Sequence, residues 1–217
     1  MHLRVDTKSA VVLVHGLAAH RVVMSPLERH LKPRFTQVTN WGYSSLWSRI
    51  ERHGAALAKL LSELESAADI EQIHLVTHSM GGIIGRLALV EKMPTKLGRM
   101  VMVAPPNGGS HVARWLSPLL GLICPPLVQL SDHDQSFVAG LPPLTGVYVG
   151  VVAAAADELV CEQSTHLPNE ADHITLPGFH SSILWFDETA RQVAHFLEQG
   201  RFERGADTTR VKQPAAA

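Results

Sequence analysis

The sequence of 217 residues predicts one α/β domain built on a mainly parallel sheet of about six strands, with helices on both faces. Short apolar segments recur along the chain and end in turn-forming or polar residues, which is typical of strands buried on both faces. Most intervals between them carry apolar residues at helical spacing. With 46% hydrophobic and 18% charged residues, the chain can bury a sizeable core.

The individual elements follow from the same patterns. In the short segment 25–34, Ser25 is the expected helix cap and Pro26 the first helical residue. The expected strands, each running into a turn or loop, lie in 10–16, 35–45, 71–79, 97–110, 145–158 and 172–182. The expected helices lie in 25–34, 46–67, 80–92 and 181–200.

Two regions fit the alternation less well. Residues 110–145 are rich in Pro and Leu with weak periodicity, which leaves open a small lid over a site or a long connection. The polar end of the chain, 203–217, is expected to be a flexible tail. The domain itself is therefore expected to occupy residues 1–202.

Composition excludes several classes of function. A net charge of −1 gives no electrostatic basis for binding nucleic acid. The opening segment lacks the features of a secretory signal, so we expect a cytoplasmic protein, and no apolar run is long enough for an integral membrane segment. Cys124 and Cys161 are expected to be free thiols, with a disulfide left open. Neither cysteine nor histidine spacing predicts a metal site, and no cofactor is expected.

Ser79 stands at a corner between an expected strand and an expected helix, in the stretch THSMGG. A very tight strand-to-helix turn exposes the side chain at the bend, and it needs small residues two positions to either side. Gly81 fills the second of these positions, whereas Thr77 stands where glycine is usual. The helix that follows points its positive end at the site, which favours an anion there. The pattern predicts a nucleophilic serine, the alternative being a simple helix cap.

A nucleophilic serine needs a base and an acid, which follow it along the chain in this arrangement. His180 lies in the loop after the last expected strand and is the predicted base. Asp157 follows the preceding strand and is the predicted acid, with its neighbour Glu158 as first substitute. Asp172 is expected at the wrong end of the sheet. The remaining outside candidates for the acid are Asp132 and Asp134.

An oxyanion that develops during acyl transfer needs two backbone N–H donors. Met80, directly after the serine, is expected to supply one. The loop after the first strand, in VHGLAAH, is expected to supply the other, and Leu17 is the chosen residue.

The motifs VHGL, THSMGG, ADELV and GFHS, in this order, resemble the α/β-hydrolase superfamily. The resemblance covers roughly residues 8–200 and is closest to small lipase and esterase members without a large cap domain. The segments VAPPNGGS and WGYSS are similar to site-facing loops of such members. The resemblance implies Ser79 as nucleophile, Asp157 as acid and His180 as base, with Leu17 and Met80 as oxyanion donors.

The expected activity is hydrolysis of a small lipophilic ester through an acyl-enzyme, without metal or organic cofactor. Apolar residues expected near the site suit such a substrate, although any of them could belong to the core. They are Leu17, Trp47, Met80, Trp115, residues 116–127 and Trp185. An acyltransferase or a thioesterase would use the same residues, and a non-catalytic ligand-binding protein is the alternative from another class. Oligomeric state is not predicted.

Overall fold

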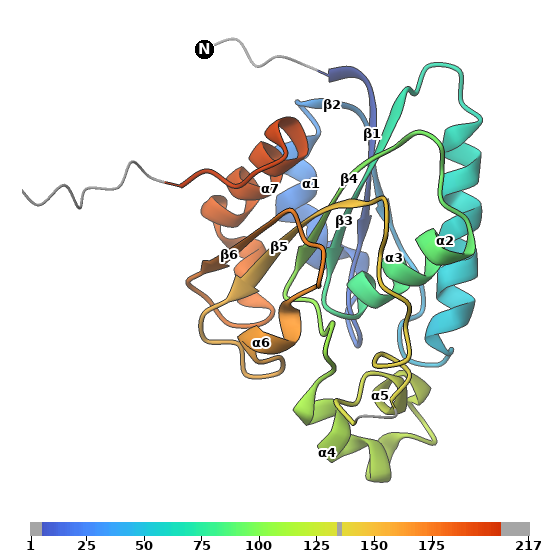
Figure 1. The fold of residues 1–217 in the computed structure, drawn as a ribbon, viewed down its shortest axis with the longest axis vertical. Coiled ribbons are helices and arrows are strands. Elements are labelled where there is room, and N and C mark those ends of the chain that lie inside the picture. The colour runs from blue at the N-terminus through green and yellow to red at the C-terminus, as the bar shows by residue number, and fades with distance from the viewer. Residues whose placement is uncertain (1–5, 134–135, 205–217) are drawn as a thin grey trace, which may run out of the picture.

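The computed structural model describes residues 6–133 and 136–204, which form one six-stranded sheet in the order β2-β1-β3-β4-β5-β6 (Figure 1). Every neighbouring pair of strands is parallel. The predicted sheet is thereby confirmed. The strands are β1 (Asp6–Val14), β2 (Phe35–Trp41), β3 (Gln72–His78), β4 (Leu97–Val103), β5 (Tyr148–Ala154) and β6 (Asp172–Leu176).

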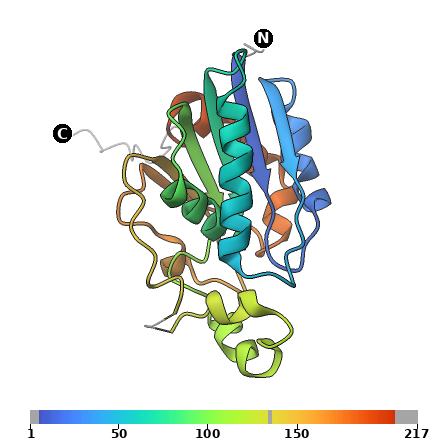
Figure 2. The same ribbon diagram turned by 90° about the vertical axis from the view of Figure 1, so that its right-hand side faces the viewer.

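Helices cover both faces of the sheet (Figures 1 and 2). On one face α2 (Ile50–Glu65) packs against α3 (Met80–Glu91), and on the other α1 (Ser25–Leu31) packs against α7 (Asp187–Gln199). Alternate residues of β1 serve different cores, because successive side chains of a strand point to opposite faces. Val12 joins the core beneath α2 and α3, and Val11 joins the core beneath α1 and α7. Burial on both sides explains the continuous apolar segments in the sequence.

The predicted cap at Ser25 is wrong. Ser25 is the first residue of α1, which continues directly from a 3-10 helix, Arg21–Met24. The Nδ1 atom of His20 instead accepts a hydrogen bond from the N–H of Val22 at 3.4 Å. The helical conformation thus begins at Arg21, four residues before Ser25. The capping side chain is therefore His20, which accepts one of the N–H groups that have no partner within the helix.

The segment 110–145 contains two helices, α4 (His111–Leu120) and α5 (Pro125–Gln129), beyond the end of the sheet (Figures 1 and 2). Gln129 ties α5 to α2, because its Oε1 accepts the N–H of Ile50 at 2.8 Å and its Nε2 donates to Glu51 at 2.7 Å. The short helix α6 (Glu162–Thr165) follows β5. Residue 134 and most of the predicted tail, from 205 onward, lie outside the described residues.

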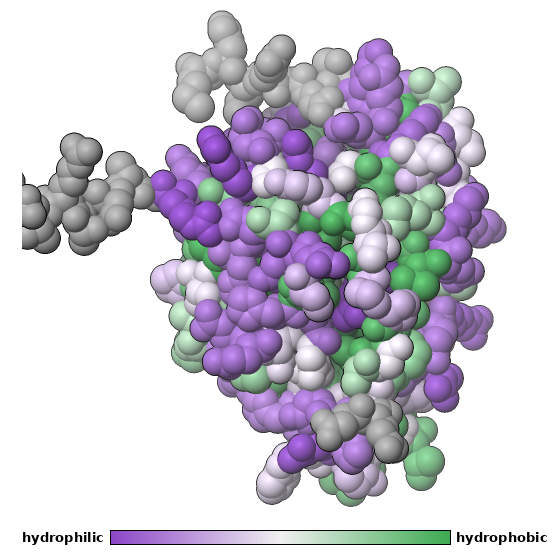
Figure 3. All heavy atoms as spheres, viewed as in Figure 1, coloured by the Kyte–Doolittle hydropathy of each residue, from purple (hydrophilic) through white to green (hydrophobic). Residues whose placement is uncertain are grey.

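The surface mixes polar and apolar side chains. Figure 3 shows a face on which hydrophilic residues dominate the left half, while hydrophobic ones gather right of centre, where α3 lies in Figure 1. On α4 and the turn after it, Trp115 and Leu122 are 81% and 101% exposed. Within the described ranges, no helix has the length and apolar character needed to cross a membrane.

Close packing between α3 and β1 predicts a strict requirement for glycine at position 81. A Cβ there would lie 2.4 Å from the carbonyl oxygen of Val14 and 2.7 Å from that of His15, which are backbone atoms. We expect Gly81→Ala to lower the free energy of unfolding by about 1–3 kcal/mol or more, measured by urea denaturation. The matched control is Gly140→Ala, whose Cβ would meet its nearest atom at 3.6 Å. Equal stability of the two variants would contradict this packing.

Candidate active site

Ser79 occupies the corner between β3 and α3 in a backbone conformation that side chains rarely adopt, with φ 53° and ψ −128°. Such a conformation costs about 1–3 kcal/mol, so the surroundings must hold it. The N–H of Ser79 donates to the carbonyl of Val103 at 2.9 Å, and its carbonyl accepts the N–H of Gly82 at 2.8 Å. These bonds anchor the corner to β4 on one side and to α3 on the other.

The room for Thr77, where glycine is usual, comes from glycines of α3. A Cβ at Gly85 would lie 3.3 Å from the Thr77 methyl group, and one at Gly82 would lie 3.5 Å from its hydroxyl. That hydroxyl donates to the carbonyl of Val101 at 3.4 Å. The larger side chain of Thr77 therefore fits because Gly82 and Gly85 leave space on the neighbouring face of α3.

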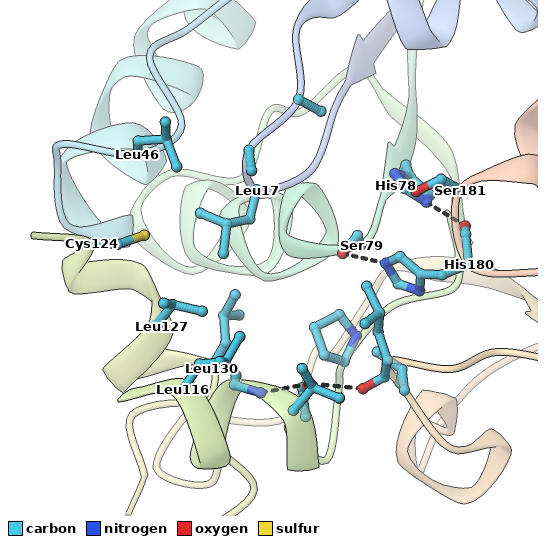
Figure 4. Close-up of a pocket in the computed structure, with 18 of the residues that line it drawn as sticks. Leu17, Leu46, His78, Ser79, Leu116, Cys124, Leu127, Leu130, His180 and Ser181 are labelled. Atoms are coloured by element: carbon cyan, nitrogen blue, oxygen red, sulfur yellow. Dashed lines mark hydrogen bonds between the residues drawn. The ribbon is translucent and has the colours of Figure 1, made fainter. Parts of the chain in front are cut away.

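The structure brings Ser79, His180 and Asp157 together in one hydrogen-bonded chain. Ser79 Oγ lies 2.8 Å from His180 Nε2 (Figure 4), and His180 Nδ1 lies 2.8 Å from Asp157 Oδ2. The side chains of His180 and Asp157 are each 3% exposed. The three residues follow β3, β6 and β5, whose carboxyl ends share one edge of the parallel sheet.

Asp157 is held as a carboxylate. Its Oδ1 accepts the N–H groups of Leu159 and Val160, each at 2.9 Å. Burial raises the pKa of the carboxyl group, but the hydrogen bond from His180, the charge of that ring and the two backbone N–H groups outweigh burial and lower the pKa below its usual value. The group is thus ionised at neutral pH and accepts from the Nδ1–H of His180.

The other acidic candidates among the described residues do not reach the imidazole ring. Glu158 accepts the backbone N–H of His180 at 3.2 Å. Asp172 is the first residue of β6, at the opposite end of that strand, where it binds Arg204 and the N–H of Phe202. Asp132 pairs with Arg114 of α4 at 3.5 Å. Asp134 lies outside the described residues.

His78 contributes to the site by holding the backbone of His180, and this function was not predicted from the sequence. His78 is buried, and its Nε2 donates to the carbonyl of His180 at 2.9 Å. Burial, reinforced by repulsion from the His180 ring when that ring is protonated, lowers the pKa of His78 to about 3. The neutral ring therefore supplies the N–H that this bond requires. The only sequence signal was its position directly before Ser79.

The two predicted oxyanion donors lie at the same edge. Met80 is the first residue of α3, so its N–H has no partner within the helix. Leu17 lies in the turn after β1 and lines the pocket beside Ser79. Tyr43 steadies this turn, because its hydroxyl donates to the carbonyl of His15 at 2.6 Å and its ring stacks on the His15 ring at 4.2 Å. The function of the Met80 and Leu17 N–H groups as oxyanion donors stays a prediction.

A pocket of about 410 Å³ opens in front of Ser79 and His180. Figure 4 shows leucines on the side opposite His180, contributed by the turn after β1, the loop before α2, and the α4–α5 segment. The predicted lining is correct in part. Leu17 and Trp185 line the pocket, as do Leu116, Leu120, Cys124 and Leu127 from the predicted segment 116–127.

Three other predicted lining residues lie elsewhere. Met80 is fully buried in the core between the sheet, α2 and α3, because the helix turns its side chain away from the corner. Trp47 and Trp115 are largely exposed and do not line the pocket. Cys124 and Cys161 are both free thiols, the first buried and the second exposed.

Comparison with known proteins agrees with this architecture. The mature form of the Bacillus licheniformis lipase BlEst2 matches with a TM-score of 0.69 at 18% identity, over 91% of this chain and 94% of that chain. Its propeptide form matches with a TM-score of 0.71 at 19% identity, over 95% of this chain and 53% of that chain, so this chain spans about half of its length. The metagenomic carboxyl esterase MGS0156 matches with a TM-score of 0.66 at 20% identity, over 82% and 67% of the two chains.

At these identities the structural likeness shows the fold alone. A comparison with curated proteins finds no match. The model of the alpha/beta hydrolase family matches residues 11–212. The chain belongs to this family.

The geometry predicts which carboxylate matters. Asp157→Asn cannot hold the His180 ring in the same tautomer, so we expect hydrolytic activity to fall by roughly three to four orders of magnitude. Asp172→Asn removes a carboxylate at the far end of β6 and is expected to retain activity within a few-fold. Steady-state kcat/KM of the two variants, with folding checked by circular dichroism, is the measurement. The reverse ranking would assign the acid to another residue.

Proposed function

We propose that the protein is a serine carboxylic-ester hydrolase, of the esterase or lipase type, which acts on a small lipophilic ester. The observation that carries the proposal is the hydrogen-bonded chain from Asp157 through His180 to Ser79, which ends in an apolar pocket. Lipases and an esterase among the structural neighbours agree with this class.

The proposed reaction proceeds in two steps. His180 Nε2 takes the proton of Ser79 Oγ as that oxygen attacks the ester carbonyl carbon. The carbon–oxygen bond of the ester breaks, and the departing alcohol takes the proton from His180. A water molecule then gives a proton to His180 and attacks the acyl carbon. The bond from that carbon to Ser79 Oγ breaks, Oγ takes the proton from His180, and the acid is released. Asp157 keeps the ring in the productive tautomer and stabilises the imidazolium.

The charge that develops on the carbonyl oxygen needs donors in fixed positions. We assign the N–H groups of Met80 and Leu17 to this function. The positive end of α3 points to the same place, because α3 begins directly after Ser79. Neither donor depends on a side chain, so the interaction is built into the turns that follow β3 and β1.

The apolar lining supports a lipophilic acyl or alcohol group, since polar substrates would lose hydration there without gaining partners. The same lining favours the second candidate activity, transfer of the acyl group to an alcohol or thiol in place of water. Helices α4 and α5 contribute Leu116 and Leu127 to the pocket. Their opening and closing as a lid stays a prediction.

The direct test is hydrolysis of p-nitrophenyl esters from short to long acyl chains. We expect turnover by the parent protein and a loss of roughly three orders of magnitude or more in kcat for Ser79→Ala. Ser62→Ala, a serine of α2 outside the pocket, serves as the matched control and should retain full activity.

Three results would contradict the proposal. A folded parent protein without activity on any chain length, with or without an added alcohol acceptor, would favour a ligand-binding protein. Activity that survives Ser79→Ala would mean that another group carries the reaction. Product formed only with the added alcohol would identify the acyltransferase alternative.

A further inference from the structure

A second group of chemistry-bearing side chains lies between α6 and β6, apart from the residues that line the pocket. His166, Glu170 and His173 each present one potential ligand atom, and these atoms all lie within 4.8 Å of one another. His166 Nδ1 is 2.6 Å from Glu170 Oε1. The two imidazole rings stack with centroids 4.0 Å apart and planes 16° apart. The loop thus folds back so that potential ligand atoms from three separate positions lie close together.

Hydrogen bonds from behind hold two of these side chains in place. Glu170 Oε2 accepts the N–H of Leu167 at 2.9 Å, which leaves Oε1 facing the histidines. His173 Nε2 lies 3.1 Å from the hydroxyl oxygen of Thr165, and that hydroxyl donates to the carbonyl of Glu162 at 2.6 Å. Side chains that bind metal ions are oriented by second partners of this kind.

The three side chains carry the donor types that a metal ion needs. Metal ions bind histidine through a ring nitrogen of the neutral imidazole. The carboxylate of Glu170 supplies the negative charge at the same point.

We propose that His166, Glu170 and His173 bind one zinc ion. Two imidazole nitrogens and one carboxylate oxygen suit Zn²⁺ better than Mg²⁺ or Ca²⁺, which prefer oxygen ligands. Ligand atoms around a tetrahedral zinc lie roughly 3.4 Å apart, so the His166–Glu170 contact of 2.6 Å opens and the two stacked rings turn out of parallel when both bind one ion. His166 is half-exposed, which leaves the fourth position to water.

The position of this site gives it a structural consequence. His166 and Glu170 lie in the loop that follows α6, and His173 lies in β6. That loop continues from the turn that carries Asp157, and β6 leads directly to His180. A bound zinc ion therefore ties together the two segments that present Asp157 and His180 to each other. The sequence alone predicted no metal site, because these residues match no metalloprotease spacing.

The test measures the zinc affinity of the protein after treatment with a chelator. Zinc sulfate is added in the presence of a chromophoric chelator that competes for the ion. We expect one zinc per chain and an upward shift of the melting temperature. His166→Ala and Glu170→Gln each remove one ligand and should weaken zinc binding at least tenfold. His111→Ala removes an exposed histidine at the start of α4 and serves as the control, with parental affinity.

Neither readout depends on the ester-hydrolase proposal, so each can fail alone. The zinc proposal is overturned if the parent protein binds no stoichiometric zinc, or if His166→Ala and Glu170→Gln bind zinc as tightly as His111→Ala. Equal stabilisation by magnesium or calcium would also overturn it, because the donor set would then not be the one described.

Discussion

The site depends on one constraint, the parallel arrangement of all six strands in the described part of the chain. Parallel strands send their carboxyl ends to one edge, so the turns after β1, β3, β5 and β6 meet there. Ser79, Asp157 and His180 are far apart in the sequence, yet each lies in one of these turns. Reversing β3, β5 or β6 would carry the residue that follows it to the opposite edge.

That arrangement is maintained against local costs. Ser79 holds a backbone conformation of low intrinsic stability, and His180 and Asp157 are ionisable groups with almost no exposure. Hydrogen bonds offset these costs. The N–H of Ser79 donates to β4, and Asp157 accepts two backbone N–H groups. The backbone of His180 accepts from His78 and donates to Glu158. A buried, neutral His78 is therefore part of what keeps the His180 loop in place.

The sheet and the meeting of Ser79, Asp157 and His180 could be predicted because they follow from local patterns. The inner strands are largely apolar, and each of the three residues lies in the turn or loop that follows a strand. Chain order along a parallel sheet then brings them to one edge. The same logic placed Asp172 at the far end of β6.

What could not be predicted depends on side-chain direction and on contacts distant in sequence. Trp115 and Leu116 are neighbours on α4, yet only Leu116 faces the pocket, and weak periodicity gave no means of choosing between them. The prediction that Ser25 caps α1 was wrong because a 3-10 helix, Arg21–Met24, runs directly into α1. The cluster of His166, Glu170 and His173 exists only because the loop after α6 doubles back onto β6.

The most direct test of the account is covalent labelling with a fluorophosphonate, followed by peptide mass spectrometry. A serine oxygen activated by its neighbour displaces fluoride and keeps the phosphonyl group, whereas ordinary serines do not react. We predict one label per chain, on Ser79, and little labelling after His180→Ala. A label on another residue, or none on the folded protein, would contradict the claim that the chain from Asp157 to Ser79 activates this serine.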